Sequence, residues 1–257
     1  MLKFKKIVVI LLSLLTMGTP IKLMAEVNFY SESSTDTRTD NPVIFNRLQY
    51  EIDGLNILGK KNKFYLGTGF TQDGKTEGSV IYNDNYSFVS AGSKYSLTHN
   101  LVVFAEFRQI VEELNTANLK SKQDYRGGAY FYLREDLVKL HLFHEHYSEL
   151  IFSNRQHKDT FFMVRSRIGH AKKIIGNISA EILGETKLKL DRIGHYYENK
   201  FEIGPMLRLR ARFSQFSIDL IGGHIVGVYL GRQAVDPLPQ DKSYTNWQGL
   251  LALNGTF

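Results

Sequence analysis

The sequence predicts an all-β protein, a closed antiparallel transmembrane β-barrel of about twelve strands, with ten or fourteen as alternatives. Apolar and polar residues alternate with period two in segment after segment, and short and long connections between these segments alternate. A soluble β-sandwich also alternates, with its apolar face inward, so periodicity alone does not decide. Loop length decides, because one end with short turns and another with long loops is typical of membrane barrels.

Composition excludes several classes of protein. The chain has 257 residues, 43% hydrophobic and 23% charged, which is too apolar for a disordered chain and too mixed for a helical membrane protein. It has no cysteine, so disulfides, thiolate metal sites and cysteine nucleophiles are absent. The formal charge is +6, but the first 25 residues hold four lysines and no acid, so the rest carries 28 basic and 26 acidic residues, or +2. This small excess predicts no nucleic-acid partner.

Residues 1–25 have the pattern of a secretory signal peptide. Basic residues open the chain, the apolar run Ile7–Leu15 follows, and Leu23-Met24-Ala25 precedes Glu26. The apolar run is about half of the roughly 20 residues that a membrane-spanning helix needs. We therefore expect an exported protein that is cleaved near Ala25, with residues 26–257 forming the barrel.

The alternation is clearest in Lys200–Phe213, where the odd positions are apolar and the even positions are mostly charged. Its even positions include the run Arg208, Arg210 and Arg212. The same pattern recurs along the chain, in segments long enough for the 9–11 residues of a tilted transmembrane strand. In order, the predicted strands cover residues 44–58, 63–72, 85–97, 101–113, 124–134, 137–149, 159–170, 176–189, 198–212, 215–230 and 244–257.

The connections between these strands set the strand count. Short turns are expected at residues 59–62, 98–100, 135–136, 172–175 and 213–214, and long loops at 73–84, 114–123, 150–158, 190–197 and 231–243. Since the first of these strands ends in a short turn, another strand must precede it. Glu26–Ser34 is the available segment, with Thr35–Pro42 as its loop, and it makes the number of strands even.

The last strand carries Trp247, Leu251, Leu253 and Phe257 on one face. A final amphipathic strand that ends in phenylalanine resembles the insertion signal of bacterial outer-membrane β-barrel proteins. The resemblance implies an outer-membrane location in a Gram-negative bacterium and recognition of this strand by the barrel-assembly machinery. It also implies short periplasmic turns and longer external loops.

Inside such a barrel the charged faces of the strands must line the lumen, because a lysine or arginine facing lipid at the midplane costs roughly 2–4 kcal/mol. The predicted basic track consists of Arg165, Arg167, Arg208, Arg210 and Arg212. The predicted lumenal acids are Glu51, Asp53, Glu106, Glu181, Glu185 and Asp219. A basic track in a water-filled pore would pass small anions or acidic oligosaccharides by passive diffusion. The alternative interpretation is a set of salt bridges that fills a narrow barrel.

Size, strand count and the arginine track are broadly similar to the small twelve-stranded oligosaccharide porins. The similarity implies a non-enzymatic channel without cofactor or metal, whose partners are outer-membrane lipid and small solutes.

Two other functions are open. His146 and Ser148 share an outward face near the expected upper end of their strand, and the stretch around them is similar to the His-x-Ser-Asn of lipid A deacylases, with Glu149 in place of the Asn. A lipid hydrolase would use this pair. A metal site at His144 and His146 lacks a third ligand. A non-conducting barrel for adhesion or polysaccharide export is the other alternative, with the loop Gly231–Ser243 as its contact surface.

Overall fold

The computed structural model describes residues 25–36, 41–54, 59–60, 62–73, 86–113, 123–154, 159–192, 199–230 and 243–256. The predicted signal peptide therefore lies outside the described residues, apart from Ala25, which opens the first strand. None of the helical structure in the described ranges is long and apolar enough to cross a membrane. The strands are β1 (Ala25–Asp36), β2 (Asn41–Asp53), β3 (Asn62–Asp73), β4 (Tyr86–Ser96), β5 (Leu101–Glu113), β6 (Gln123–Leu137), β7 (Leu142–Ser153), β8 (Asp159–Ile175), β9 (Ile178–Asp191), β10 (Lys200–Arg212), β11 (Phe216–Tyr229) and β12 (Ser243–Thr256).

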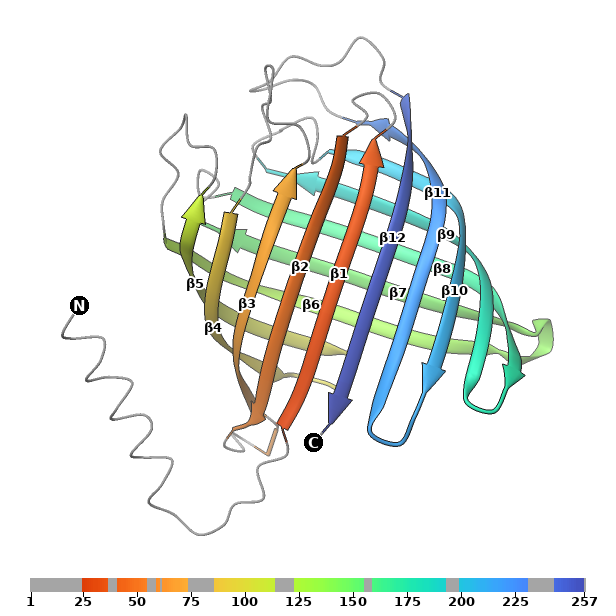
Figure 1. Ribbon diagram of the computed structural model, residues 1–257, viewed down its shortest axis with the longest axis horizontal. Helices are drawn as coiled ribbons and strands as arrows, with labels where there is room; N and C mark the ends of the chain where they lie inside the picture. The colour runs from red at the N-terminus through yellow and green to blue at the C-terminus, as the bar shows by residue number, and fades with distance from the viewer. Residues whose placement is uncertain are drawn as a thin grey trace, which may run out of the picture.

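These twelve strands of the described chain form one closed antiparallel barrel, which confirms the predicted fold class. Each strand pairs with its neighbours in sequence, and β1 pairs with both β2 and β12. In Figure 1, β2, β1 and β12 stand side by side at the front. Closure leaves no exposed sheet edge, which is the condition for a β-sheet to lie in lipid.

The period-two pattern separates the two faces of the wall. On β10, Ile203, Leu207 and Leu209 are 50%, 50% and 41% exposed, whereas Arg208 between them is 2% exposed. The pattern holds around the barrel, where exposed large apolar side chains on the outward positions include Leu48, Tyr50, Phe64, Leu66, Phe70, Val89, Phe152, Phe162, Ile168, Ile182, Leu220, Val226 and Trp247. Apolar side chains thus form the outer surface and the charged ones face inward.

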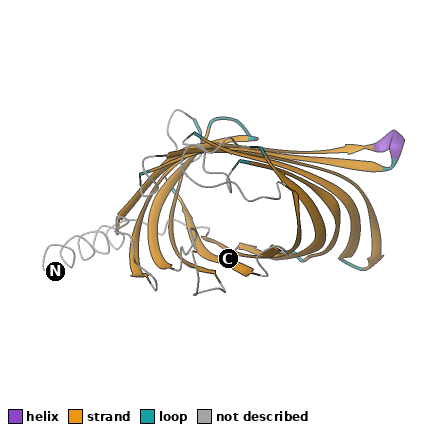
Figure 2. Cartoon of the chain, turned by 90° about the horizontal axis from the view of Figure 1, so that it is seen from above, coloured by secondary structure: helices purple, strands orange, loops and turns teal. Residues whose placement is uncertain are grey.

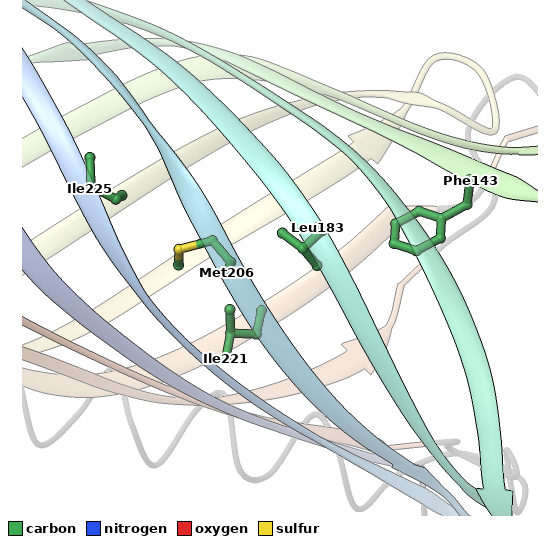
Figure 3. Packing of buried hydrophobic residues seen from close by; sticks show 5 residues of the cluster. All are labelled: Phe143, Leu183, Met206, Ile221 and Ile225. Carbon is green, nitrogen blue, oxygen red and sulfur yellow. The ribbon is translucent and has the colours of Figure 1, made fainter.

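The interior is not wholly polar. Phe143, Leu183, Met206, Ile221 and Ile225 form a buried apolar cluster on the inner side of β7, β9, β10 and β11, against which Leu250 packs (Figure 3). A second cluster on β4 and β5 consists of Tyr86, Phe88 and Ile110, with Phe45 of β2 against it. Side chains therefore fill part of the lumen that the sequence pattern assigned to ionised groups alone.

Four short connections lie wholly within the described residues, and they share one end of the barrel: the turns β4–β5, β6–β7, β8–β9 and β10–β11. We refer to this end as the turn end and to the opposite one as the loop end. Gly176 has a positive φ of 50° in the β8–β9 turn, a conformation that glycine adopts without strain. The predicted long loops fall mainly outside the described residues.

The predicted turn at residues 135–136 was wrong. Strand β6 continues to Leu137, and the turn consists of the 3-10 helix η1 (Val138–Leu140) followed by His141 in the left-handed region. Pairing persists across the predicted turn because Arg134 forms an ion pair with Glu145 on β7, at 2.5 Å. The resulting hairpin reaches further out than its neighbours (Figure 2). As a consequence, His146 lies in the half of β7 near the turn end rather than at the upper end of its strand.

Candidate functional site

Four cavities follow one another along the barrel interior. The loop-end cavity has a volume of about 200 Å³ and includes Phe161 and Met163 of β8 in its wall. The upper middle cavity has a volume of about 60 Å³ and is lined on this strand by Met163, Arg165 and Arg167. The lower middle cavity has a volume of about 190 Å³ and is lined on this strand by Arg165 and Arg167. Since β8 runs from the loop end to the turn end, these residues place the cavities in axial order.

Strand β1 continues the series in the opposite direction. Glu32 lines the upper middle cavity, Tyr30 lines both middle cavities, and Asn28 lines the turn-end cavity, of about 400 Å³. The two middle cavities share a wall made of Tyr30, Arg165, Arg167, Ile221 and Leu250. The two middle cavities adjoin at these residues, which we name the constriction.

The predicted basic track lines this series of cavities. Arg165 and Arg167 lie in the wall of both middle cavities, Arg208 and Arg210 in the lower one, and Arg212 in the turn-end cavity. The closed barrel thus brings all five arginines to the walls of these cavities. Their state of pairing, however, differs from residue to residue.

Arg208 is held by two carboxylates from different strands. Its Nη1 and Nη2 donate to the two oxygens of Glu145 at 2.8 and 2.7 Å, and its Nε donates to Glu181 Oε2 at 2.5 Å. Arg134 Nη1 also donates to Glu145, at 2.5 Å. The side chains of Glu145, Glu181 and Arg208 are nearly inaccessible to solvent. We name Arg134, Glu145, Glu181 and Arg208 the ion-pair layer, and it joins β6, β7, β9 and β10 on the inner face of one stretch of the barrel wall.

Arg210 and Arg167 are also neutralised. Arg210 donates to both oxygens of Asp219 at 2.6 and 2.8 Å, a bidentate geometry that is among the stronger ion pairs. Arg167 Nη2 lies 2.6 Å from Glu185 Oε2. The predicted acids Glu181, Glu185 and Asp219 therefore serve as partners of the arginines.

Arg165 is different. Within the described part of the chain no carboxylate lies within ion-pair distance of it, and its guanidinium group lies over the ring of Tyr147, 5.3 Å from the centroid. Because it lines both middle cavities, it presents a cation to any solute at the constriction.

The remaining predicted acids lie on the other side of the barrel. Glu106 accepts from Arg47 Nη2 at 2.7 Å and from Tyr65 Oη at 2.8 Å. Glu51 accepts from Lys94 Nζ at 2.5 Å. Asp53, at the turn end of β2, is exposed. These contacts connect β2, β3, β4 and β5, and none of the residues that form them lines the four cavities.

Several residues of the cavity walls and of the ion-pair layer were missed by sequence analysis. Tyr30 and Glu32 lie on the weakly patterned first strand, and their positions inside the barrel follow only from the pairing of β1 with both β2 and β12. Arg134 fell at the edge of a turn predicted too early. Ile221 lies on β11, where apolar residues occupy both faces, so alternation gives no signal there.

The described residues of the predicted insertion signal point away from the cavities. Trp247 is 61% exposed on the outer face and packs its ring against His224 at 4.8 Å. Leu251 and Leu253 share its face, and Phe257 lies outside the described residues.

The outward histidine pairs with a serine that sequence analysis did not select. His146 Nδ1 lies 3.2 Å from Ser166 Oγ, directly across the β7–β8 pair, rather than against Ser148 two residues along its own strand. The ring of His144 is 6.3 Å from that of His146. The described residues contain no group of three His, Cys, Asp or Glu side chains that could hold a metal ion. Of the loop proposed for adhesion, residues 231–242 lie outside the described residues.

Comparison with known proteins gives the fold without a close relative. No family model and no curated protein matches the sequence. Among solved structures, the β-domain of the Bordetella autotransporter BrkA is 11% identical, with 91% of this chain and 99% of that chain covered and a TM-score of 0.51. An outer membrane channel from Pseudomonas putida F1 is 12% identical, with 93% and 97% covered and a TM-score of 0.47. The KdgM porin is 9% identical, with 90% and 99% covered and a TM-score of 0.41. The chain therefore has the fold of the bacterial outer-membrane β-barrel proteins.

Proposed function

We propose that the protein is a narrow outer-membrane channel for the passive diffusion of small solutes. The observation that carries the proposal is the series of four cavities, lined by charged side chains, that runs from the loop end to the turn end with one constriction. In this proposal the leader is removed near Ala25 and the last strand directs assembly in the outer membrane.

The pairing pattern favours small anions over oligosaccharides. The upper middle cavity, about 60 Å³ in volume, is far below the roughly 300–1,000 Å³ of sites for drug-sized ligands. Arg208 and Arg210 have their charges compensated by carboxylates, so they contribute less to attraction of anions than an unpaired track would. Anion preference is therefore assigned to Arg165 at the constriction, where a cation in a narrow pore acts at close range.

Recording from single channels in planar bilayers tests this function. Purified protein should give small, discrete current steps, and the reversal potential in a KCl gradient should show preference for chloride. Arg165→Gln should shift the reversal potential toward zero selectivity. Lys139→Gln, which removes the same charge from the exposed β6–β7 turn, is the matched control and should leave it unchanged. Insertion without any current would refute the proposal.

A lipid hydrolase is a second candidate, because His146 and Ser166 form a hydrogen-bonded pair on the lipid-facing wall. A histidine within reach of a serine hydroxyl is the arrangement that activates a nucleophile. The structure favours Ser166 over Ser148 for that role, so Ser166→Ala should abolish release of fatty acid from phospholipid vesicles and Ser148→Ala should not. Absence of fatty-acid release by the wild-type protein would remove this candidate.

A further inference from the structure

The two middle cavities combine apolar side chains with charged ones. Of the arginines in their walls, Arg165 is the one that no described carboxylate holds at ion-pair distance. Met163, Met206, Ile221 and Leu250, from four different strands, line the upper middle cavity, and Ile221 and Leu250 also line the lower one. A pore built only for hydrated ions has no need of such a surface. Met206 and Ile221 belong to the buried cluster of Figure 3, and Leu250 packs against it.

Arg165 lies in the wall of the same two cavities. Its guanidinium group is planar and carries fixed donors that match the two oxygens of a carboxylate. The ring of Tyr147 lies against it, and among the described side chains no carboxylate is within ion-pair distance. It is thus able to accept a carboxylate from a solute without first breaking an ion pair.

We infer that the middle cavities bind small monocarboxylates with an apolar body, with the carboxylate on Arg165 and the apolar part against Ile221 and Leu250. The inference rests on the proposed channel function and names its substrate class. Volumes of about 60 and 190 Å³ limit the body to a single ring or a short chain.

The same surface disfavours acidic sugars. Hydroxyl groups that are buried against apolar side chains without a partner lose their hydrogen bonds to water, and that loss is costly. A sugar acid with its carboxylate on Arg165 would place part of its hydroxyls against Ile221 and Leu250, which offer them no hydrogen-bond partner, whereas an aromatic or aliphatic body removes apolar surface from water there.

Equilibrium dialysis against protein in lipid nanodiscs, with empty nanodiscs as the blank, tests the inference with three probes. Benzoate carries the charge and the ring, glucuronate carries the charge on a polyhydroxylated body, and benzyl alcohol carries the ring without the charge. Benzoate should bind at least about tenfold more tightly than either of the others, since each lacks one of the two contacts. Equal binding of benzoate and glucuronate, equal binding of benzoate and benzyl alcohol, or no binding of benzoate would overturn the inference.

Substitutions at the proposed contacts test where in the barrel benzoate binds. Arg165→Gln should weaken benzoate binding about tenfold and leave benzyl alcohol unaffected, with Arg165→Lys between the two. Leu250→Ser should weaken benzoate, whereas Leu251→Ser, its outward-facing neighbour, should not. Loss of benzoate binding in Leu251→Ser equal to that in Leu250→Ser would contradict the placement.

The two proposals fail separately. Binding of benzoate by a barrel that passes no current would remove the channel and keep the site. Current without preference for benzoate over glucuronate would keep the channel and remove the site.

Discussion

Replacement of Arg208 by methionine tests the ion-pair layer most sharply. Arg208 is 2% exposed and donates three hydrogen bonds of 2.5 to 2.8 Å to Glu145 and Glu181. Methionine fills a similar volume but donates none of these bonds, so two buried carboxylates lose a partner. The barrel must then hold negative charge in a place where water has little access.

The expected loss of stability depends on which cations Glu145 and Glu181 keep. Removal of one partner from a buried ion pair costs about 3–5 kcal/mol. Glu145 keeps Arg134 at 2.5 Å, and Glu181 keeps Arg210 at 3.4 Å, so neither carboxylate is left without a cation. We therefore expect Arg208→Met to lower the free energy of unfolding by about 3 kcal/mol, the lower end of that range.

Urea unfolding in lipid vesicles, followed by the fluorescence of Trp247, measures the effect, because the chain contains one tryptophan. The matched control is Arg212→Met, on the same face of β10 and four residues further along the chain. Its side chain is exposed, so the expected change in the free energy of unfolding is within about 0.5 kcal/mol. Equal losses in the two variants, or a loss below 1 kcal/mol in Arg208→Met, would show that the ion-pair layer is not structural.

The remaining predictions concern the outer wall, the constriction and one close approach. Leu207→Arg places a charge on the lipid-facing side at the middle of β10 and should lower the free energy of unfolding by about 2–4 kcal/mol relative to Leu207→Ala in the same urea titration. Equal stability of the two variants would show that residue 207 does not face lipid. Tyr30→Ala removes a ring from the wall shared by both middle cavities and should raise single-channel conductance, whereas Tyr50→Ala on the outer face should not. Gly92→Ala would bring a Cβ to 2.4 Å from the ring of Tyr65 and should lower the free energy of unfolding by about 1–3 kcal/mol, while Gly222→Ala, with only one atom near, at 3.8 Å, should be tolerated in the same assay.

The barrel could be predicted from the sequence because its main signal is local. Alternation on β10 assigns Arg208 inward and Leu209 outward without knowledge of any other strand. The closing strand β1 followed from the requirement for an even number of strands, even though its own pattern is weak. The β6–β7 turn was misplaced because the Arg134–Glu145 pair extends the hairpin, and that pair is visible only once the two strands face each other.

The candidate site was harder to predict because its ion pairs form between strands that are distant in the sequence. The sequence placed the arginines on one face but did not show that Glu145, 63 positions away, would neutralise Arg208. The sequence also gave no reason to expect different pairing for Arg165 and Arg167. Within the described chain Arg165 has no carboxylate at ion-pair distance, whereas Arg167 lies 2.6 Å from Glu185. Pairing of this kind depends on the register of the strands and on how closely side chains from nearby strands approach inside the barrel.

Substituted-cysteine modification during bilayer recording tests the central claim, since the natural chain has no cysteine and each variant therefore carries one thiol. On β12, Gln248 and Ala252 line the middle cavities, while Leu251 and Leu253 face outward. A membrane-impermeant anionic thiosulfonate should react with Gln248→Cys and Ala252→Cys and reduce the current, and it should leave Leu251→Cys and Leu253→Cys unmodified. Modification of Leu251→Cys as fast as Ala252→Cys, or full modification of Ala252→Cys without a change in current, would contradict the account.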